Sequence, residues 1–118
     1  MPFSGDPSKL LSGILADISR VEYFTRGMDQ QAFEKDDRTA YAVKYALLRI
    51  SEAAYRLGEK GSELCPSITW RDVRGLGNRL RHAYDSIDTS LIWLIVEKDL
   101  GALKAAVRAA LPGIESPE

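Results

Sequence analysis

Apolar residues recur every three or four positions through four long segments of this chain, and none of the four alternates as a half-buried strand would. This period predicts an all-α fold. The expected helices span about 7–26, 37–57, 70–84 and 89–111. Because the connections are short, the simplest arrangement is an up-and-down four-helix bundle in a single domain, residues 1–118, with a helical core at about 7–112.

Smaller features modify this outline. A short additional helix is expected after Asp29, and residues 60–68 are expected to form a loop around Cys65-Pro66. A bend is expected near 99–101, where a glycine weakens the last helix, and Pro112-Gly113 is expected to end that helix.

Size and charge exclude several classes of protein. A chain of 118 residues is too short for a two-domain enzyme with its own cofactor module. The net charge of -1 excludes a global attraction to nucleic acid or membranes, so any such attraction needs a local patch. The longest apolar run, Leu91–Val96, is too short to span a bilayer. One cysteine and no visible export signal in Met1–Lys9 predict a cytoplasmic protein without a membrane partner.

Few residues are available for metal or cofactor chemistry. His82 and Cys65 are the only residues of their types, whereas zinc sites need several such ligands. No glycine-rich phosphate loop of the Walker or dinucleotide type is present. We therefore expect no metal and no cofactor.

The second predicted helix has two apolar faces. One carries Val43, Leu47, Ile50 and Ala54, whereas the opposite side carries Tyr41, Tyr45, Leu48 and Tyr55. A helix with two apolar faces buries more than one small bundle can cover. This pattern favours a homodimer or partner interface, the alternative being tyrosines that lie half-exposed in water.

The third predicted helix also divides into two sides. Its apolar side carries Trp70, Val73, Leu76, Gly77, Leu80, Ala83, Tyr84 and Ile87. Its polar side carries Arg71, Arg74, Asn78, His82 and Asp85, flanked by Arg79 and Arg81. Such a strip of arginines with one imidazole is suited to hold phosphate and to move a proton near neutral pH.

Three alternatives remain open for this helix. The arginines could be an ordinary solvated face, and His82 could serve only as a favourable charge near a helix C-terminus. Cys65 and His82 could also form a nucleophile pair, although no other residue points to one. Gly77 is unusual inside a helix, so either another backbone approaches it closely or the position has lost a larger side chain.

The segment Gly75–Tyr84 resembles the signature of the HepT-like family, within the HEPN superfamily. The family pattern is an Arg-Asn pair, three residues, His, one residue and Tyr. Here this pattern follows Trp70 and precedes Ile87-Asp88, as in the family. Further similar stretches lie in the same order at 24–28, 37–43, 52–54 and 93–100.

The resemblance implies an all-α bundle that dimerises, with the motif helices of two protomers lining one cleft. Members of the family are metal-independent ribonuclease toxins that act on RNA. The partner is a minimal nucleotidyltransferase antitoxin, which neutralises the toxin by adding AMP to the motif tyrosine. The family's Asn, His and Tyr fall on Asn78, His82 and Tyr84.

One position departs from the family, since its arginine falls on Gly77. Arg74 lies on the same arc as Asn78 and His82, so we predict these three as the catalytic residues. Arg71, Arg79 and Arg81 are predicted to bind substrate phosphates. With glycine at 77, two other hypotheses stay open. The chain could be a module that only docks a nucleotidyltransferase, or a structural homodimer without chemistry.

Overall fold

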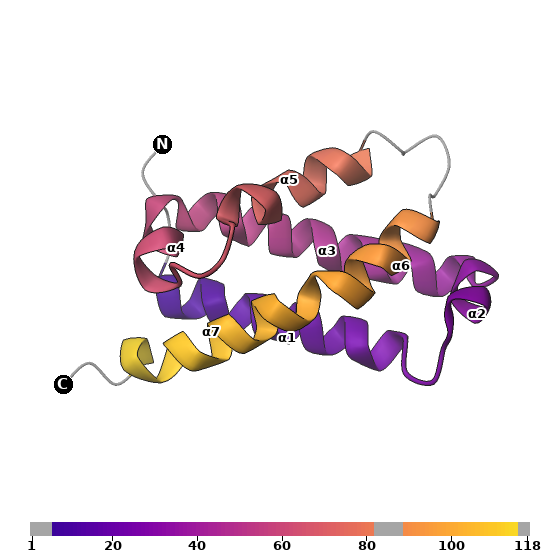
Figure 1. Ribbon diagram of the computed structural model, residues 1–118, viewed down its shortest axis with the longest axis horizontal. Helices are drawn as coiled ribbons and strands as arrows, with labels where there is room; N and C mark the ends of the chain where they lie inside the picture. Colours follow the sequence, from indigo (N-terminus) through magenta and orange to yellow (C-terminus); the bar gives the residue numbers. More distant parts are fainter. Residues whose placement is uncertain (1–5, 82–88, 116–118) are drawn as a thin grey trace.

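The computed structural model describes residues 6–81 and 89–115, with side chains described as far as Pro112. Within these residues the chain is helical and contains no strand, as the sequence period predicted (Figure 1). No helix of the described part is both long and apolar enough to cross a membrane.

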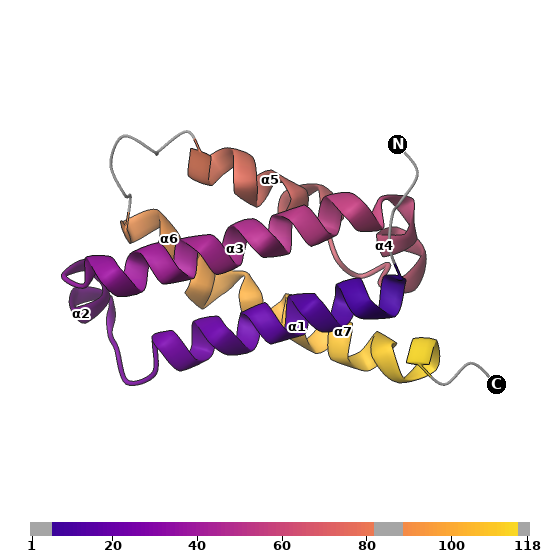
Figure 2. The same cartoon turned by 180° about the vertical axis from the view of Figure 1, so that it is seen from behind.

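Helices α1 (Pro7–Phe24) and α3 (Asp37–Leu57) run antiparallel and form the centre of the bundle (Figure 2). The Asp6 side chain accepts a hydrogen bond from the Ser8 backbone N–H at 2.9 Å and caps α1. The helices bury apolar stripes against each other: Leu11, Ile14, Ile18 and Val21 on α1, and on α3 the predicted stripe of Val43, Leu47, Ile50 and Ala54. Helix α3 ends before Gly58, whose φ of 55° suits a glycine.

The remaining helices pack against this pair and do not cover all of its faces. Helix α5 (Trp70–Arg81) packs along another side of α3, and α7 (Leu100–Glu115) packs on α1. The short helix α2 (Gln30–Glu34) packs on α6 (Thr89–Lys98), where the ring centroids of Phe33 and Trp93 lie 5.3 Å apart. Helices α6 and α7 meet at Asp99 and together form the predicted bent last helix. The helical bundle and the additional short helix are therefore confirmed.

The prediction of a loop at 60–68 is wrong in its first part, because Glu59–Leu64 forms helix α4. Packing of Trp70 explains the difference. The Trp70 ring lies about 3.0 Å from the place where a Cβ of Gly61 would be, and its Nε1 donates to the Cys65 carbonyl at 3.1 Å. This anchor folds the connection back beneath the start of α5.

The predicted stop at Pro112-Gly113 is also wrong, because α7 continues to Glu115. A proline inside a helix removes one backbone hydrogen bond. Pro112 lacks only its own N–H, so the N–H groups of the residues after it can still bond within the helix.

Candidate functional site

Helix α5 has the two sides that its sequence predicts. Trp70, Val73, Leu76, Gly77 and Leu80 are buried, whereas Arg71, Asn78, Arg79 and Arg81 are exposed and Arg74 is half-buried. The four arginines therefore lie along the solvent side of one helix that is anchored by Trp70 and α3.

The charges of these four arginines are not neutralised within the described part of the chain. No carboxylate of residues 6–81 or 89–112 forms an ion pair with Arg71, Arg74, Arg79 or Arg81. Their guanidinium groups retain donors for an external anion, and planar guanidinium groups match phosphate oxygens well. We call the four residues the arginine strip.

Gly77 lies at the contact between α5 and α3, and Ser51 is the residue of α3 that it meets. The Ser51 Oγ donates to the Arg74 carbonyl at 2.7 Å and accepts from the Gly77 N–H at 3.1 Å. A Cβ on residue 77 would lie 2.9 Å from this Oγ. Position 77 thus faces a neighbouring helix, so an arginine could replace this glycine only if Ser51 moved. Sequence alone suggested a close approach of another backbone to Gly77 as one explanation of this glycine. In the structure the Ser51 side chain makes this close approach.

Ser51 was not among the residues that the sequence singled out. It lies in the core-facing stripe of α3 beside Ile50 and Ala54, and is 3% exposed. A lone serine in such a stripe is the signal that could have identified it, because buried hydroxyls need hydrogen-bond partners.

Two predicted site residues lie outside the described part of the chain. The structure describes α5 as far as Arg81 and describes the chain again from Thr89, so the geometry of His82 and Tyr84 stays a prediction. Arg74, Asn78 and Arg81 lie on one side of the described part of α5, and Arg81 directly precedes position 82 in the sequence.

Arg79 lies on a different edge of α5. It lines a groove of about 600 Å³ between α5 and the junction of α6 with α7. Its lining includes the apolar side chains of Leu76 and Leu103 and the charged residues Lys98 and Asp99.

Cys65 does not have the properties of a nucleophile. Its side chain is buried beside α7, where Sγ lies 4.0 Å from the Ala106 carbonyl. Desolvation raises the pKa of the thiol, so the reactive thiolate is disfavoured. The alternative of a Cys65–His82 nucleophile pair is therefore not supported.

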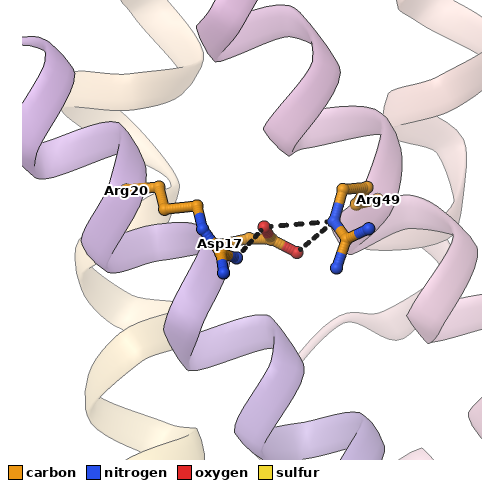
Figure 3. Close-up of polar contacts among 3 residues, drawn as sticks. All are labelled: Asp17, Arg20 and Arg49. Atoms are coloured by element: carbon orange, nitrogen blue, oxygen red, sulfur yellow. Dashed lines mark hydrogen bonds and ion pairs between the residues drawn. The ribbon is translucent and has the colours of Figure 1, made fainter.

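A second polar cluster joins α1 to α3 (Figure 3). The Asp17 carboxylate is 3% exposed and accepts from Arg20 Nη1 at 2.7 Å and from Arg49 Nε at 3.1 Å. A hydrogen bond to Asp17 and the negative charge of Asp17 raise the pKa of Arg49 above its ordinary value. A pocket of about 340 Å³ adjoins the cluster, with Tyr45 on its wall. Sequence reasoning missed Asp17, although a carboxylate between Ile14 and Ile18 interrupts an apolar stripe.

The second apolar face of α3 is uncovered in the single chain. Tyr41, Tyr45 and Tyr55 are 62%, 64% and 55% exposed, and Leu48 is partly buried. We call these four residues the tyrosine face.

Comparison with known proteins identifies relatives along nearly the whole chain. The profile of the family described as "Ribonuclease HepT-like" matches residues 14–110. A protein of Thermococcus cleftensis named "Probable ribonuclease HepT" is 34% identical over 94 residues, which is 80% of this chain and 86% of that protein. A protein of Methanocaldococcus jannaschii named "Putative RNase MJ1380" is 34% identical over 102 residues, covering 86% of this chain and 94% of the relative. No solved structure matches this chain.

Proposed function

Because the chain belongs to the HepT-like ribonuclease family, we propose that it is the ribonuclease toxin of a type VII toxin–antitoxin pair. It acts in the cytoplasm and cleaves RNA without a metal ion. The observation that supports this best is the arginine strip, four cations on one helix with no carboxylate partner among the described residues. A protein with a net charge of -1 attracts an RNA backbone only through such a local patch.

In the proposed reaction, His82 accepts the proton of a ribose 2′-hydroxyl. The 2′-oxygen then forms a bond to the adjacent phosphorus, and the bond from phosphorus to the 5′-oxygen breaks. A proton from an imidazolium goes to the leaving 5′-oxygen, which yields a 2′,3′-cyclic phosphate and a 5′-hydroxyl. The arginines offset the charge that develops on the phosphoryl oxygens. Asn78 orients His82 or the substrate.

Two copies of the chain are proposed to form this site. The tyrosine face supports a homodimer, because aromatic residues are enriched at the centres of interfaces. Helix α5 packs on another side of α3, and in the proposed dimer the two arginine strips line one shared cleft.

The proposed partner is a minimal nucleotidyltransferase antitoxin. It transfers AMP from ATP to the Tyr84 hydroxyl, forming an oxygen–phosphorus bond and releasing pyrophosphate. A phosphodiester beside His82 adds a negative charge where the substrate phosphate binds, so it excludes RNA by repulsion and by occupancy.

One observation favours a second candidate function. Gly77 is buried against Ser51, so position 77 provides no guanidinium. A module that docks the nucleotidyltransferase and presents Tyr84, without cutting RNA, needs none.

Cleavage of single-stranded RNA by purified protein in excess EDTA distinguishes these functions. We expect cleavage by the parent protein and a 2′,3′-cyclic phosphate at the new 3′ end, detected by mass spectrometry. His82→Ala should abolish cleavage and growth inhibition at little cost in thermal stability. If His82→Ala cuts RNA as well as the parent does, the catalytic proposal fails. If the parent does not cut RNA at all, the docking function takes its place.

A further inference from the structure

Arg81 and Ser51 both lie close to the position that a Cβ of residue 77 would occupy. Arg81 Nη2 lies 3.2 Å from the place where a Cβ of residue 77 would be. Residues four apart share one side of a helix, and helical side chains lean toward the N-terminus. The Arg81 side chain therefore reaches back one turn, and its guanidinium lies where a side chain of residue 77 would begin.

We propose that Arg81 supplies the catalytic guanidinium of the site, which offsets the charge that develops on the phosphoryl oxygens, from the space that a side chain at position 77 would otherwise occupy. This inference rests on the proposed ribonuclease function and changes the residue to which the role was assigned from sequence. Arg74 was predicted for that role because of its place on the helix arc, whereas the structure favours Arg81.

The location of Arg81 distinguishes it from the other members of the arginine strip. Arg79 lines the groove toward α6 and α7, on a different edge of α5. Arg71 and Arg74 precede Arg81 by about three turns and two turns of helix. Arg81 is three residues from Asn78, on a neighbouring part of the same face, and it directly precedes His82 in the sequence.

Gly77 and Ser51 have a physical role in this arrangement. Ser51 fixes the backbone of α5 through its bonds to Arg74 and Gly77, and the missing Cβ lets the guanidinium lie close to that backbone. A glycine inside a helix is unfavourable relative to alanine, because it loses more conformational freedom on folding. The close approach of two side chains accounts for a residue that is otherwise unfavourable there.

The first test compares kcat/KM on one RNA substrate among single variants. Arg81→Ala and Arg81→Gln should each lower it on the order of a hundredfold, as removal of one donor to a developing anion does. Arg108→Ala, an exposed arginine on α7, is the matched control and should change it less than about twofold. Arg74→Ala should lower it at least tenfold less than Arg81→Ala. Circular dichroism confirms that each variant keeps its helices.

The second test moves the guanidinium back by one turn. Ser51→Ala removes the Oγ that lies 2.9 Å from a Cβ at 77, and leaves the Ser51 Cβ at an ordinary 3.5 Å. The triple variant Ser51→Ala/Gly77→Arg/Arg81→Ala should recover at least tenfold of the activity lost in Arg81→Ala. Its control, Ser51→Ala/Gly77→Ala/Arg81→Ala, has the same backbone contacts and no guanidinium, and should recover none.

The outcomes separate this inference from the proposed function. If the parent cuts RNA and the kcat/KM of Arg81→Ala is within twofold of the parent value, the proposed role of Arg81 is wrong, whereas the ribonuclease proposal is unaffected. If the parent does not cut RNA, the ribonuclease proposal fails. Fluorescence anisotropy with a labelled single-stranded RNA then decides the role of Arg81. Equal affinity of the parent and Arg81→Ala overturns it, whereas weaker binding by Arg81→Ala alone supports a phosphate contact.

Discussion

Ser51 is a polar side chain buried among apolar ones, at the contact between α3 and α5. Its hydroxyl uses both of its hydrogen-bonding functions on the backbone of α5, as donor to the Arg74 carbonyl and as acceptor from the Gly77 N–H. Such bonds specify one register of α5 along α3, because a shift by one residue would leave a buried hydroxyl without partners.

The Ser51–Gly77 contact predicts a strong coupling between the two positions. Gly77→Ala alone should lower the free energy of unfolding by about 1–3 kcal/mol, because the added Cβ meets Ser51 Oγ in a packed interface. In a Ser51→Ala background the same change should be neutral or stabilising, since alanine favours a helix. Urea denaturation at one protein concentration measures both effects. Equal effects in the two backgrounds would show that Ser51 does not determine the residue at 77.

Tyr84 is predicted to be the acceptor of AMP, and its hydroxyl is the only group that this role requires. Tyr84→Phe keeps the ring, so the melting temperature should change little while incorporation of labelled AMP by the nucleotidyltransferase disappears. Tyr55→Phe, on α3, removes an exposed hydroxyl elsewhere and should leave incorporation intact. Undiminished labelling of Tyr84→Phe would place the modification on another residue.

At the scale of elements, α5 shows how one helix serves both packing and binding. On its buried side, Trp70 packs on Gly61, and Gly77 contacts Ser51 of α3. Its other side carries the arginine strip. Both anchoring contacts are on the buried side of α5, with Gly61 of α4 and Ser51 of α3, so substitutions on the strip can change binding without removing core contacts. Helix α4 belongs to this support, because it provides the buried Gly61 on which the Trp70 ring packs.

The arginine strip predicts a salt dependence of RNA binding. If Arg71 and Arg79 each contact a phosphate, the double reversal Arg71→Glu/Arg79→Glu should reduce the slope of log affinity against log salt by about two. Lys9→Glu/Arg108→Glu makes the same change in net charge on α1 and α7, away from the strip, and should leave most of the slope. An unchanged slope in the strip variant would identify the strip as a solvated face. Measurements of anisotropy between about 50 and 200 mM salt suffice.

At the scale of the whole molecule, the single chain leaves three large tyrosines of α3 more than half exposed. Their rings lie on the side of α3 opposite the core, between charged residues that include Arg49 and Glu52. Burial of this apolar surface stabilises an assembly by about 25 cal/mol per Å², which a monomer forgoes.

A homodimer is therefore expected in solution. Light scattering at micromolar concentration should give twice 13.1 kDa for the parent. Tyr41→Asp/Tyr45→Asp should give the monomer mass, because two buried carboxylates at the centre of the interface lack partners. The double change Tyr23→Asp/Leu94→Asp introduces the same charges at exposed positions outside the tyrosine face, and should leave the dimer intact. A monomeric parent would remove the shared cleft.

The amino-acid sequence alone determined those features that depend on neighbours along the chain. Helical period predicted the all-α bundle, Gly58 marked the end of α3, and the amphipathic pattern of α5 separated Trp70 and Leu80 from the arginine strip. The motif from Asn78 to Tyr84 indicated the family, because its spacing can be read without any tertiary contact.

Tertiary structure alone decided which side chains meet across helices. Ser51 meets Gly77 across 26 residues, and Arg49 meets Asp17 across 32. Helix α4 forms because Trp70 packs on Gly61, and α7 continues past Pro112. Only the structure shows that the Arg81 guanidinium lies beside the space that a side chain at position 77 would fill. Sequence periodicity shows which face of a helix is buried, whereas the distance between helix backbones sets which atoms fit between them.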